Sequence, residues 1–306
     1  LAENVEAKNI LDDALNEFTA LLAHHPNVSD YRWGQAASKA VLTQVLRDLG
    51  DNEHAVTVAN EAIAEYSALL KDDPDVPGHK HDRAVCRSNL GQVLHKLDRN
   101  AEAEHGLREA IRELRELAEA SAHVPQYRDG LAWSWTRLGE LFWATDRFQQ
   151  AREAFQRARE LRNDLAERFT QQAGYKHQLA WLLATCPDPD FRDAREAVRR
   201  ANQAIEIAPR NETYRNCLGV ALYRAEQWKA SIQALEEAME LRTAGTSLDW
   251  FFLAMAHWKL GDTDLALEEY RKAKQWMEQH KPDDPELLRF RDEAMLLGIT
   301  MDETAR

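Results

Sequence analysis

The chain has 306 residues, of which 12 are Gly and 9 are Pro, whereas Ala, Leu, Glu, Lys and Arg together make up 151 residues, or 49%. A composition rich in helix formers and poor in turn residues predicts an all-α fold and excludes sandwiches, barrels and α/β folds. The net charge of −13 disfavours nucleic acid and anionic membranes as partners. No apolar run reaches about 18 residues, so we expect no membrane insertion by this chain.

A repeat of 48 residues runs through the first part of the chain. At this offset, small residues align with small residues and aromatic residues with aromatic ones, as in the series Ala14, Ala62, Ala110 and Ala158 and the series Tyr31, His79, Tyr127 and Tyr175. A fixed period of this length indicates an array of supersecondary units rather than one globular core.

Each unit is predicted to be a pair of long helices. Apolar residues recur at i, i+3, i+4 and i+7, for example at Leu107, Ala110, Ile111 and Leu114. We expect the helices to be broken at prolines and at tight turns, namely at Pro26, Pro74 and Pro125 and near Gly50, Asp98 and Asp146. Because no helix covers its own apolar stripe, the hairpins must stack, which predicts an α-solenoid.

The later part of the chain has shorter units. Pro187 is predicted to end one helix early, and from about residue 197 the spacing falls to 34 and 35 residues. Residues 285–298 read as a single capping helix. The expected division is long-helix repeats over 1–196, ordinary-length repeats over 197–279 and the capping helix with its tail over 280–306, in one continuous solenoid. Residues 3–24 align with second helices, so we expect that the natural protein continues upstream with the missing first helix.

Residues 135–158 carry a family resemblance. Trp135, Leu138, Gly139, Phe142, Ala151, Phe155 and Ala158 resemble the tetratricopeptide (TPR) pattern W-x2-L-G-x2-Y, A-x3-F, A. Three further segments, which contain Leu90, Leu218 and Leu253 at the same repeat position as Leu138, resemble the TPR pattern less completely. The step from this Leu to the Ala (or Ser) across the tight turn is always 13 residues, so the extra 14 residues of each long unit lie at the opposite edge of the solenoid. The widened edge is therefore on one side only.

Residues 175–297 show a narrower resemblance, to the C-terminal TPR tails of large bacterial Ser/Thr protein kinases. It is carried by the strings AWLLATCPDPDFRDA, RNCLGVALYRAEQWKASIQALEEAMELR and DWFFLAMAHWKLGD. This resemblance implies that the chain is the C-terminal region of a signalling protein. Kinase catalysis is not implied for the chain itself, because it has no Gly-rich phosphate loop, H-R-D or D-F-G string.

We expect neither catalytic residues nor a cofactor or metal site. The His79, His81 and Asp82 cluster is best interpreted as part of a helix start, since metal ligands need convergence that one exposed turn rarely gives. Three widely spaced cysteines without a CxxC pair are typical of reduced thiols in a cytoplasmic protein.

The TPR resemblance implies that the first helix of each hairpin lines a concave groove in which a protein or peptide partner docks. Carrying these positions over by register predicts a groove formed by Arg47, Asn89, His95, Lys96, Arg137, Trp143, Asn216, Tyr223, Arg224, Met255, Trp258 and Lys259. Its cations favour an acidic or carboxylate-bearing segment. The competing interpretation is that Trp143, Tyr223 and Trp258 pack between repeats and the cations are ordinary solvated residues.

The predicted function is a non-catalytic protein-interaction scaffold. The alternative is a structural module that forms homo-oligomers by bringing chains together through the widened edge.

Overall fold

The structure is a computed structural model that describes residues 2–242 and 244–300, and over these residues it confirms the all-α prediction. Fourteen α-helices and one short 3₁₀ helix follow one another without a strand in this part of the chain. The chain divides into two compact units at residues 161 and 162, within one helix. The continuous solenoid across this position stays a prediction.

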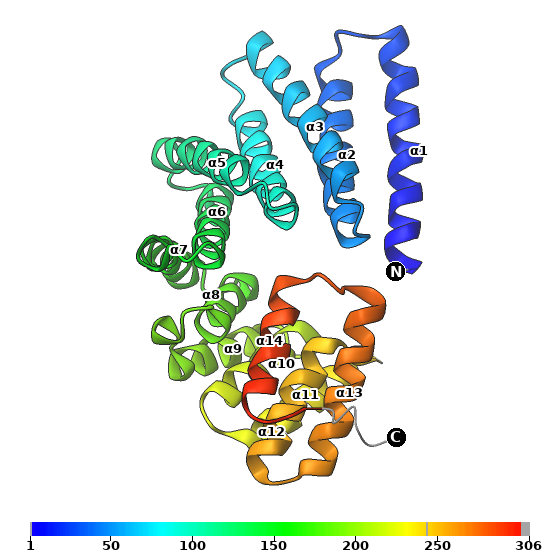
Figure 1. Ribbon diagram of the computed structural model, residues 1–306. Helices are drawn as coiled ribbons and strands as arrows, with labels where there is room; N and C mark the ends of the chain where they lie inside the picture. The colour runs from blue at the N-terminus through cyan, green and yellow to red at the C-terminus, as the bar shows by residue number, and fades with distance from the viewer. Residues whose placement is uncertain (1, 243, 301–306) are drawn as a thin grey trace. The chain divides into compact units, whose positions relative to one another are not determined.

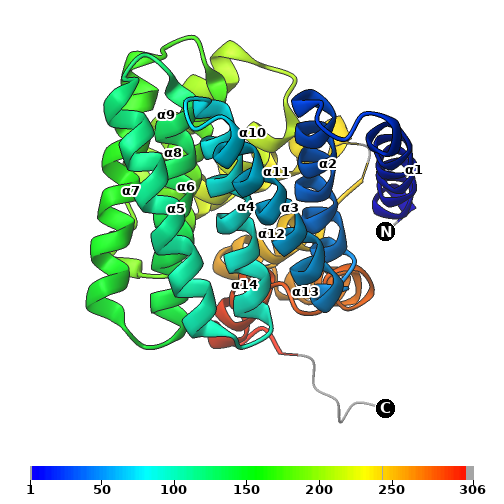
Figure 2. The ribbon, with the colours of Figure 1, turned by 90° about the horizontal axis from the view of Figure 1, so that it is seen from above.

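Unit 1 consists of long antiparallel helices joined by short connections (Figure 1). Its helices are α1 (Ala2–His24), α2 (Ser29–Asp48), α3 (Asn52–Asp72), α4 (Pro77–Lys96), α5 (Asn100–Ala120), α6 (Pro125–Ala144) and the first part of α7 (Phe148–Arg168). Consecutive helices pack together, and α4 lies between α3 and α5 (Figure 2). The helices α2, α4 and α6 are the first helices of their hairpins, and α2 and α6 also pack on α4.

Unit 2 begins with the end of α7 and contains the shorter helices. They are α8 (Ala173–Thr185), the 3₁₀ helix η1 (Pro189–Phe191), α9 (Ala194–Ile207), α10 (Glu212–Arg224), α11 (Trp228–Arg242), α12 (Ser247–Leu260), α13 (Thr263–His280) and α14 (Pro285–Leu296). Its first helices are α8, α10 and α12, which pack one on the next. The prediction that α8 ends before Pro187 is confirmed.

Left-handed backbone residues mark the tight turns and reproduce the repeat period. Gly50, Asp98 and Asp146 have φ of 82°, 58° and 59° and lie 48 residues apart. The turns of unit 2 use Glu226 at 60° and Gly261 at 88°. A tight turn between antiparallel helices requires this conformation, which Gly and Asp adopt at little cost.

The two helices of a hairpin approach most closely at one glycine. A Cβ atom on Gly139 would lie 2.6 Å from the ring of Phe155, and a Cβ on Gly219 would lie 2.5 Å from Leu235. Gly91 meets Leu107 in the same way, at 2.9 Å. The small residue of the repeat pattern is therefore set by the large side chain of the facing helix.

The predicted break between helices at Pro125 is confirmed, and Pro125 itself is the first residue of α6. The preceding helix ends at Ala120, and Pro77 likewise begins α4. Proline is accommodated at the first helical position, since its missing N–H has no intrahelical partner there.

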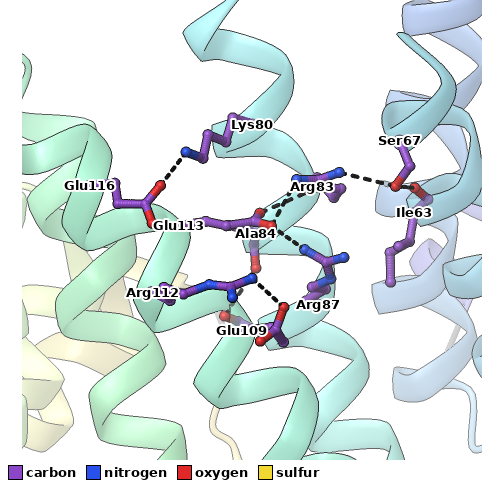
Figure 3. A network of polar contacts seen from close by, with 11 residues as sticks. Ile63, Ser67, Lys80, Arg83, Ala84, Arg87, Glu109, Arg112, Glu113 and Glu116 are labelled. Carbon is purple, nitrogen blue, oxygen red and sulfur yellow. Dashed lines mark hydrogen bonds and ion pairs between the residues drawn. The ribbon is translucent and has the colours of Figure 1, made fainter. Parts of the chain in front are cut away.

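The extra residues of the long units are held together by polar contacts between α3, α4 and α5 (Figure 3). Glu113 of α5 is only 4% exposed, and its Oε1 lies 2.8 Å from Nη2 of Arg83. Arg87 also pairs with Glu113, and Arg83 Nη1 donates to Ser67 Oγ of α3 at 3.2 Å. The buried carboxylate thus joins the two helices of one hairpin, and Arg83 extends the network to Ser67 of the preceding hairpin in the widened part of unit 1.

We expect Glu113→Ala to lower the free energy of unfolding by about 3–5 kcal/mol, because it leaves two partly buried guanidinium groups without their anion. Urea denaturation followed by circular dichroism measures this. Glu116→Ala on the same helix is the matched control, since Glu116 pairs with Lys80 at the surface and its loss costs about 1 kcal/mol or less. Equal effects of the two substitutions would contradict the structural role assigned to Glu113.

Candidate partner-binding site

The candidate site is the surface formed by the first helices of each unit, called here the first-helix face. In unit 1, side chains link neighbouring first helices directly. Arg47 Nη1 of α2 donates to Gln92 Oε1 of α4 at 2.8 Å, and the hydroxyls of Ser88 and Ser134 join α4 to α6 at 2.6 Å. Side-chain hydrogen bonds therefore join α2 to α4 and α4 to α6 in unit 1.

Most predicted site residues of unit 1 are engaged in contacts within the unit. Arg47 also contacts Asp48 Oδ1, at 2.9 Å, and Asn89 is only 6% exposed. His95 Nδ1 lies 2.7 Å from Asn100 Oδ1, while Lys96 is half-buried. Arg47 is thus already paired with a carboxylate of its own unit.

The third first helix of unit 1 carries an aromatic and a basic residue from the predicted set. Arg137 pairs with Glu140 at 2.7 Å, and its guanidinium lies 3.9 Å from the centre of the Trp133 ring. Trp143 is half-buried, with its ring edge-on to Phe148 at 4.8 Å. Packing between helices therefore accounts for part of the Trp143 surface.

In unit 2, three predicted site residues belong to the core. Asn216, Tyr223 and Met255 are 3%, 9% and 0% exposed. Asn216 Nδ2 donates to Asp249 Oδ1 at 2.6 Å, and the Tyr223 ring meets Phe252 at 5.4 Å. Burial makes these three side chains inaccessible to a partner, as the competing interpretation held for Tyr223.

The Asn216 amide is one of several groups that satisfy the buried carboxylate of Asp249. Asp249 is completely buried at the start of α12 and accepts hydrogen bonds from Arg242 Nη1 at 2.8 Å and from the Thr246 backbone N–H at 2.8 Å. A buried carboxylate needs such partners, since an unpaired one is strongly disfavoured. Asn216 is one of them and thereby fixes α10 against α12.

Arg224, at the end of α10, binds a carboxylate of its own chain. Its Nη1 lies 2.7 Å from Glu293 Oε2, and Arg192 Nη2 donates to Glu293 Oε1 at 3.0 Å. The Glu293 side chain belongs to α14. Burial alone would raise the pKa of Glu293, but Arg224 and Arg192 lower it below its usual range, so the group is ionised near neutral pH.

Both arginines are oriented by the end of α8. Arg224 Nε donates to the carbonyl oxygen of Ala184 at 3.0 Å, and Arg192 Nε donates to that of Cys186 at 2.7 Å. The register argument selected Arg224 but not Arg192, because Arg192 lies in the connection between η1 and α9 and belongs to no repeat position. Glu293 is distant in sequence, and only the tertiary structure brings it to this site.

Trp258 and Lys259 are the last two of the predicted groove residues. Trp258 is half-buried, and a Cβ on Gly298 would lie 3.4 Å from its ring. Lys259 is exposed. Among the predicted cations of unit 2, Lys259 is therefore at the surface and Arg224 is already paired.

The three cysteines lie in the core as free thiols. Burial raises the pKa of Cys86 and of Cys186 to about 12, and it raises the pKa of Cys217 as well. The thiolate is the reactive form of cysteine, so these side chains are unreactive at neutral pH. No group of three or more metal-ligating side chains occurs in the described residues.

These features define an all-α protein built from stacked helical hairpins. Family models of the tetratricopeptide repeat match residues 83–122, 134–165, 213–244 and 250–280, so the chain contains TPR repeats. Such repeats generally bind proteins or peptides. Among the described residues, no helix combines the length and apolarity needed to cross a bilayer.

A solved structure supports the helical-repeat fold. A tetratricopeptide repeat protein from Parabacteroides merdae ATCC 43184 is 13% identical with a TM-score of 0.52, over 96% of this chain and 98% of that one. BtubC (BKLC) from P. vanneervenii is 18% identical with a TM-score of 0.48, over 78% and 91% of the two chains. No curated protein sequence matches the chain.

His177 on α8 gives unit 2 a pH-dependent stability. Its ring lies 5.1 Å from Tyr214 and 6.3 Å from Trp181, and its Nε2 is buried without a hydrogen-bond partner. Burial, with a smaller effect of Arg162, lowers the pKa of His177 to about 4 from the ordinary 6.5. Below pH 6.5 the unfolded chain therefore binds a proton that the folded chain does not.

We expect the contribution of a neutral His177 to be complete above pH 6.5 and to be lost as the pH falls toward 4, by about 3 kcal/mol in total. Urea denaturation at pH 7 and pH 4.5 measures the loss. The substitution His177→Phe should remove the contribution of this residue to the pH dependence, because phenylalanine does not titrate. An unchanged pH dependence in His177→Phe would show that the buried imidazole is not its source.

Proposed function

We propose that the chain is a non-catalytic interaction scaffold that binds an acidic segment of a protein partner in unit 2, at Arg224 of the first helix α10 and Arg192 of the connection before α9. The observation that carries the proposal is the carboxylate of Glu293, held between Arg192 and Arg224 at 3.0 and 2.7 Å. Charge-assisted pairs of this kind are among the stronger polar contacts in proteins. The TPR repeats support an interaction role, and Arg224 lies within one of them, over residues 213–244.

The electrostatics of the whole chain make this local basic site selective. With a net charge of −13, most of the molecule repels acidic partners. An acidic segment is attracted only where cations are concentrated, and Arg192, Arg224 and Arg289 all act on the pKa of Glu293. Binding is therefore expected to depend on these arginines rather than on general charge.

A finer part of the proposal concerns the protein to which the chain belongs. The resemblance of residues 175–297 to the TPR tails of bacterial Ser/Thr kinases supports a role as the C-terminal region of a signalling protein that recruits a substrate or partner. Three free cysteines accord with a reducing compartment such as the cytoplasm.

We expect a random peptide library screened against the full chain to be enriched in Glu and Asp. Binding of the selected peptides should weaken at least tenfold in Arg224→Gln, because a charge-assisted hydrogen bond contributes about 1.5–3 kcal/mol. Fluorescence anisotropy measures the affinities. Arg215→Gln is the matched control, since Arg215 is on the same helix but pairs with Glu237 of α11. Peptides without acidic enrichment, or equal binding to the two variants, would refute the proposal.

A second candidate function is self-association through the widened edge. Three large apolar side chains are exposed around the connection of α1 and α2, namely Leu21 at 39%, Val28 at 37% and Trp33 at 42%. Exposed apolar residues that gather at one place are typical of interaction sites.

If this edge joins two copies, light scattering at increasing concentration will show a rise in mass, and Val28→Asp will shift that rise to higher concentration because it places a charge in the interface. A mass that stays monomeric at every concentration removes this candidate.

A further inference from the structure

Helix α14 packs on the other helices of unit 2 through one apolar face, as an amphipathic helix bound to a groove does. Leu287, Phe290 and Ala294 are 7%, 0% and 0% exposed and follow the i, i+3, i+7 spacing of one helical face. This face packs against α12 and α13, and the Phe290 ring meets Phe252 of α12 edge-on at 4.8 Å. Phe290 is thus the apolar anchor of α14, and Glu293, one turn later, is its polar anchor.

The arginines that bind Glu293 are positioned without help from α14. Their Nε atoms are fixed by the carbonyl oxygens of Ala184 and Cys186, at the end of α8. The Arg224 guanidinium also lies 5.2 Å from the Phe252 ring of α12. The two guanidinium groups are therefore preorganised for a carboxylate by contacts with the end of α8 and with α12 that do not involve α14.

The charge of this receptor requires an anion. Burial, followed by the nearby Arg224, lowers the pKa of Arg192, which shows that the two guanidinium groups disfavour each other. Glu293 relieves this repulsion. If α14 leaves, an incoming carboxylate must replace Glu293, whereas a neutral side chain leaves two desolvated cations facing one another.

Helix α14 is held by its docking contacts rather than by its own stability. It has 12 residues, and isolated helices of this length are marginal in water. At its end, Met295 and Leu296 are 46% and 89% exposed, so part of its apolar surface stays outside the packed face. These properties suit a helix that another amphipathic helix, with apolar and acidic residues at the same positions, can displace.

We infer that Arg192 and Arg224 form the carboxylate-binding part of a site for an amphipathic helix of a protein partner. The partner helix carries an aromatic residue three positions before a Glu, as Phe290 and Glu293 do, and α14 occupies the site until the partner displaces it. This inference rests on the proposed function and adds the identity of the bound segment and its intramolecular competitor.

The test uses a labelled synthetic peptide of residues 282–299 as the probe, with the full chain as the receptor. The variant Leu287→Ala with Phe290→Ala releases the chain's own α14. We expect the peptide to bind this variant at least tenfold more tightly than the wild type, because a tethered competitor acts at an effective concentration in the millimolar range. Fluorescence anisotropy gives the affinities.

Two further changes establish where the peptide binds. A peptide with Glu293→Gln, or a receptor that adds Arg224→Gln to the released variant, should bind at least tenfold more weakly, while adding Arg215→Gln should change nothing. Hydrogen–deuterium exchange of the wild-type chain supplies a measurement that needs no variant, since excess peptide should speed exchange across residues 285–296.

Equal affinity for the wild type and the released variant would overturn the inference, as would exchange across α14 that the peptide leaves unchanged. If library peptides bind through Arg224 but the α14 peptide does not bind, the scaffold function stands and the inference fails. If the α14 peptide binds but no acidic peptides are selected, the proposed recognition of acidic partners fails.

Discussion

The close approach of two helices within each hairpin is the constraint on which the rest of the structure depends. Gly91, Gly139 and Gly219 each lack the Cβ that would collide with Leu107, Phe155 and Leu235. This contact brings the helices near enough for the apolar stripe of each hairpin to form a single surface, which then packs on the neighbouring hairpin. The spacing of small and large residues therefore sets the geometry of the pair before any contact between repeats is made.

The long units of unit 1 keep this contact and extend the helices on its far side. An added two turns preserve the helical register, because about seven residues correspond to about two turns of 3.6 residues. The extended part does not simply continue the apolar core. Arg83, Arg87 and Glu113 form a partly buried ion network there, which joins the two helices of one hairpin, and Arg83 extends it to Ser67 of the preceding hairpin. Such a network favours one alignment of the two helices, since a displaced carboxylate would leave two cations unpaired.

Unit 2 contains two separate arrangements of charged side chains, one around Asp249 and one around Glu293. Asp249 and Asn216 stabilise the packing of α10 on α12, whereas Arg192 and Arg224 converge on Glu293 of α14. The first arrangement is completely buried, and it orders the core. The second joins α14 to arginines that are oriented by the carbonyl oxygens at the end of α8.

The repeat period and the composition determined the fold class, the hairpin boundaries and the turn positions, because these depend on residues near one another in sequence. The turns at Gly50, Asp98 and Asp146 and the end of α8 before Pro187 follow from such local rules. Burial of side chains at the groove positions was decided by tertiary packing, which places Met255 and Tyr223 in the core. The carboxylate site was also beyond local rules, since Arg192 lies outside the repeat register and Glu293 is 69 positions along the chain from Arg224. Only the folding of α14 onto unit 2 brings these charges together.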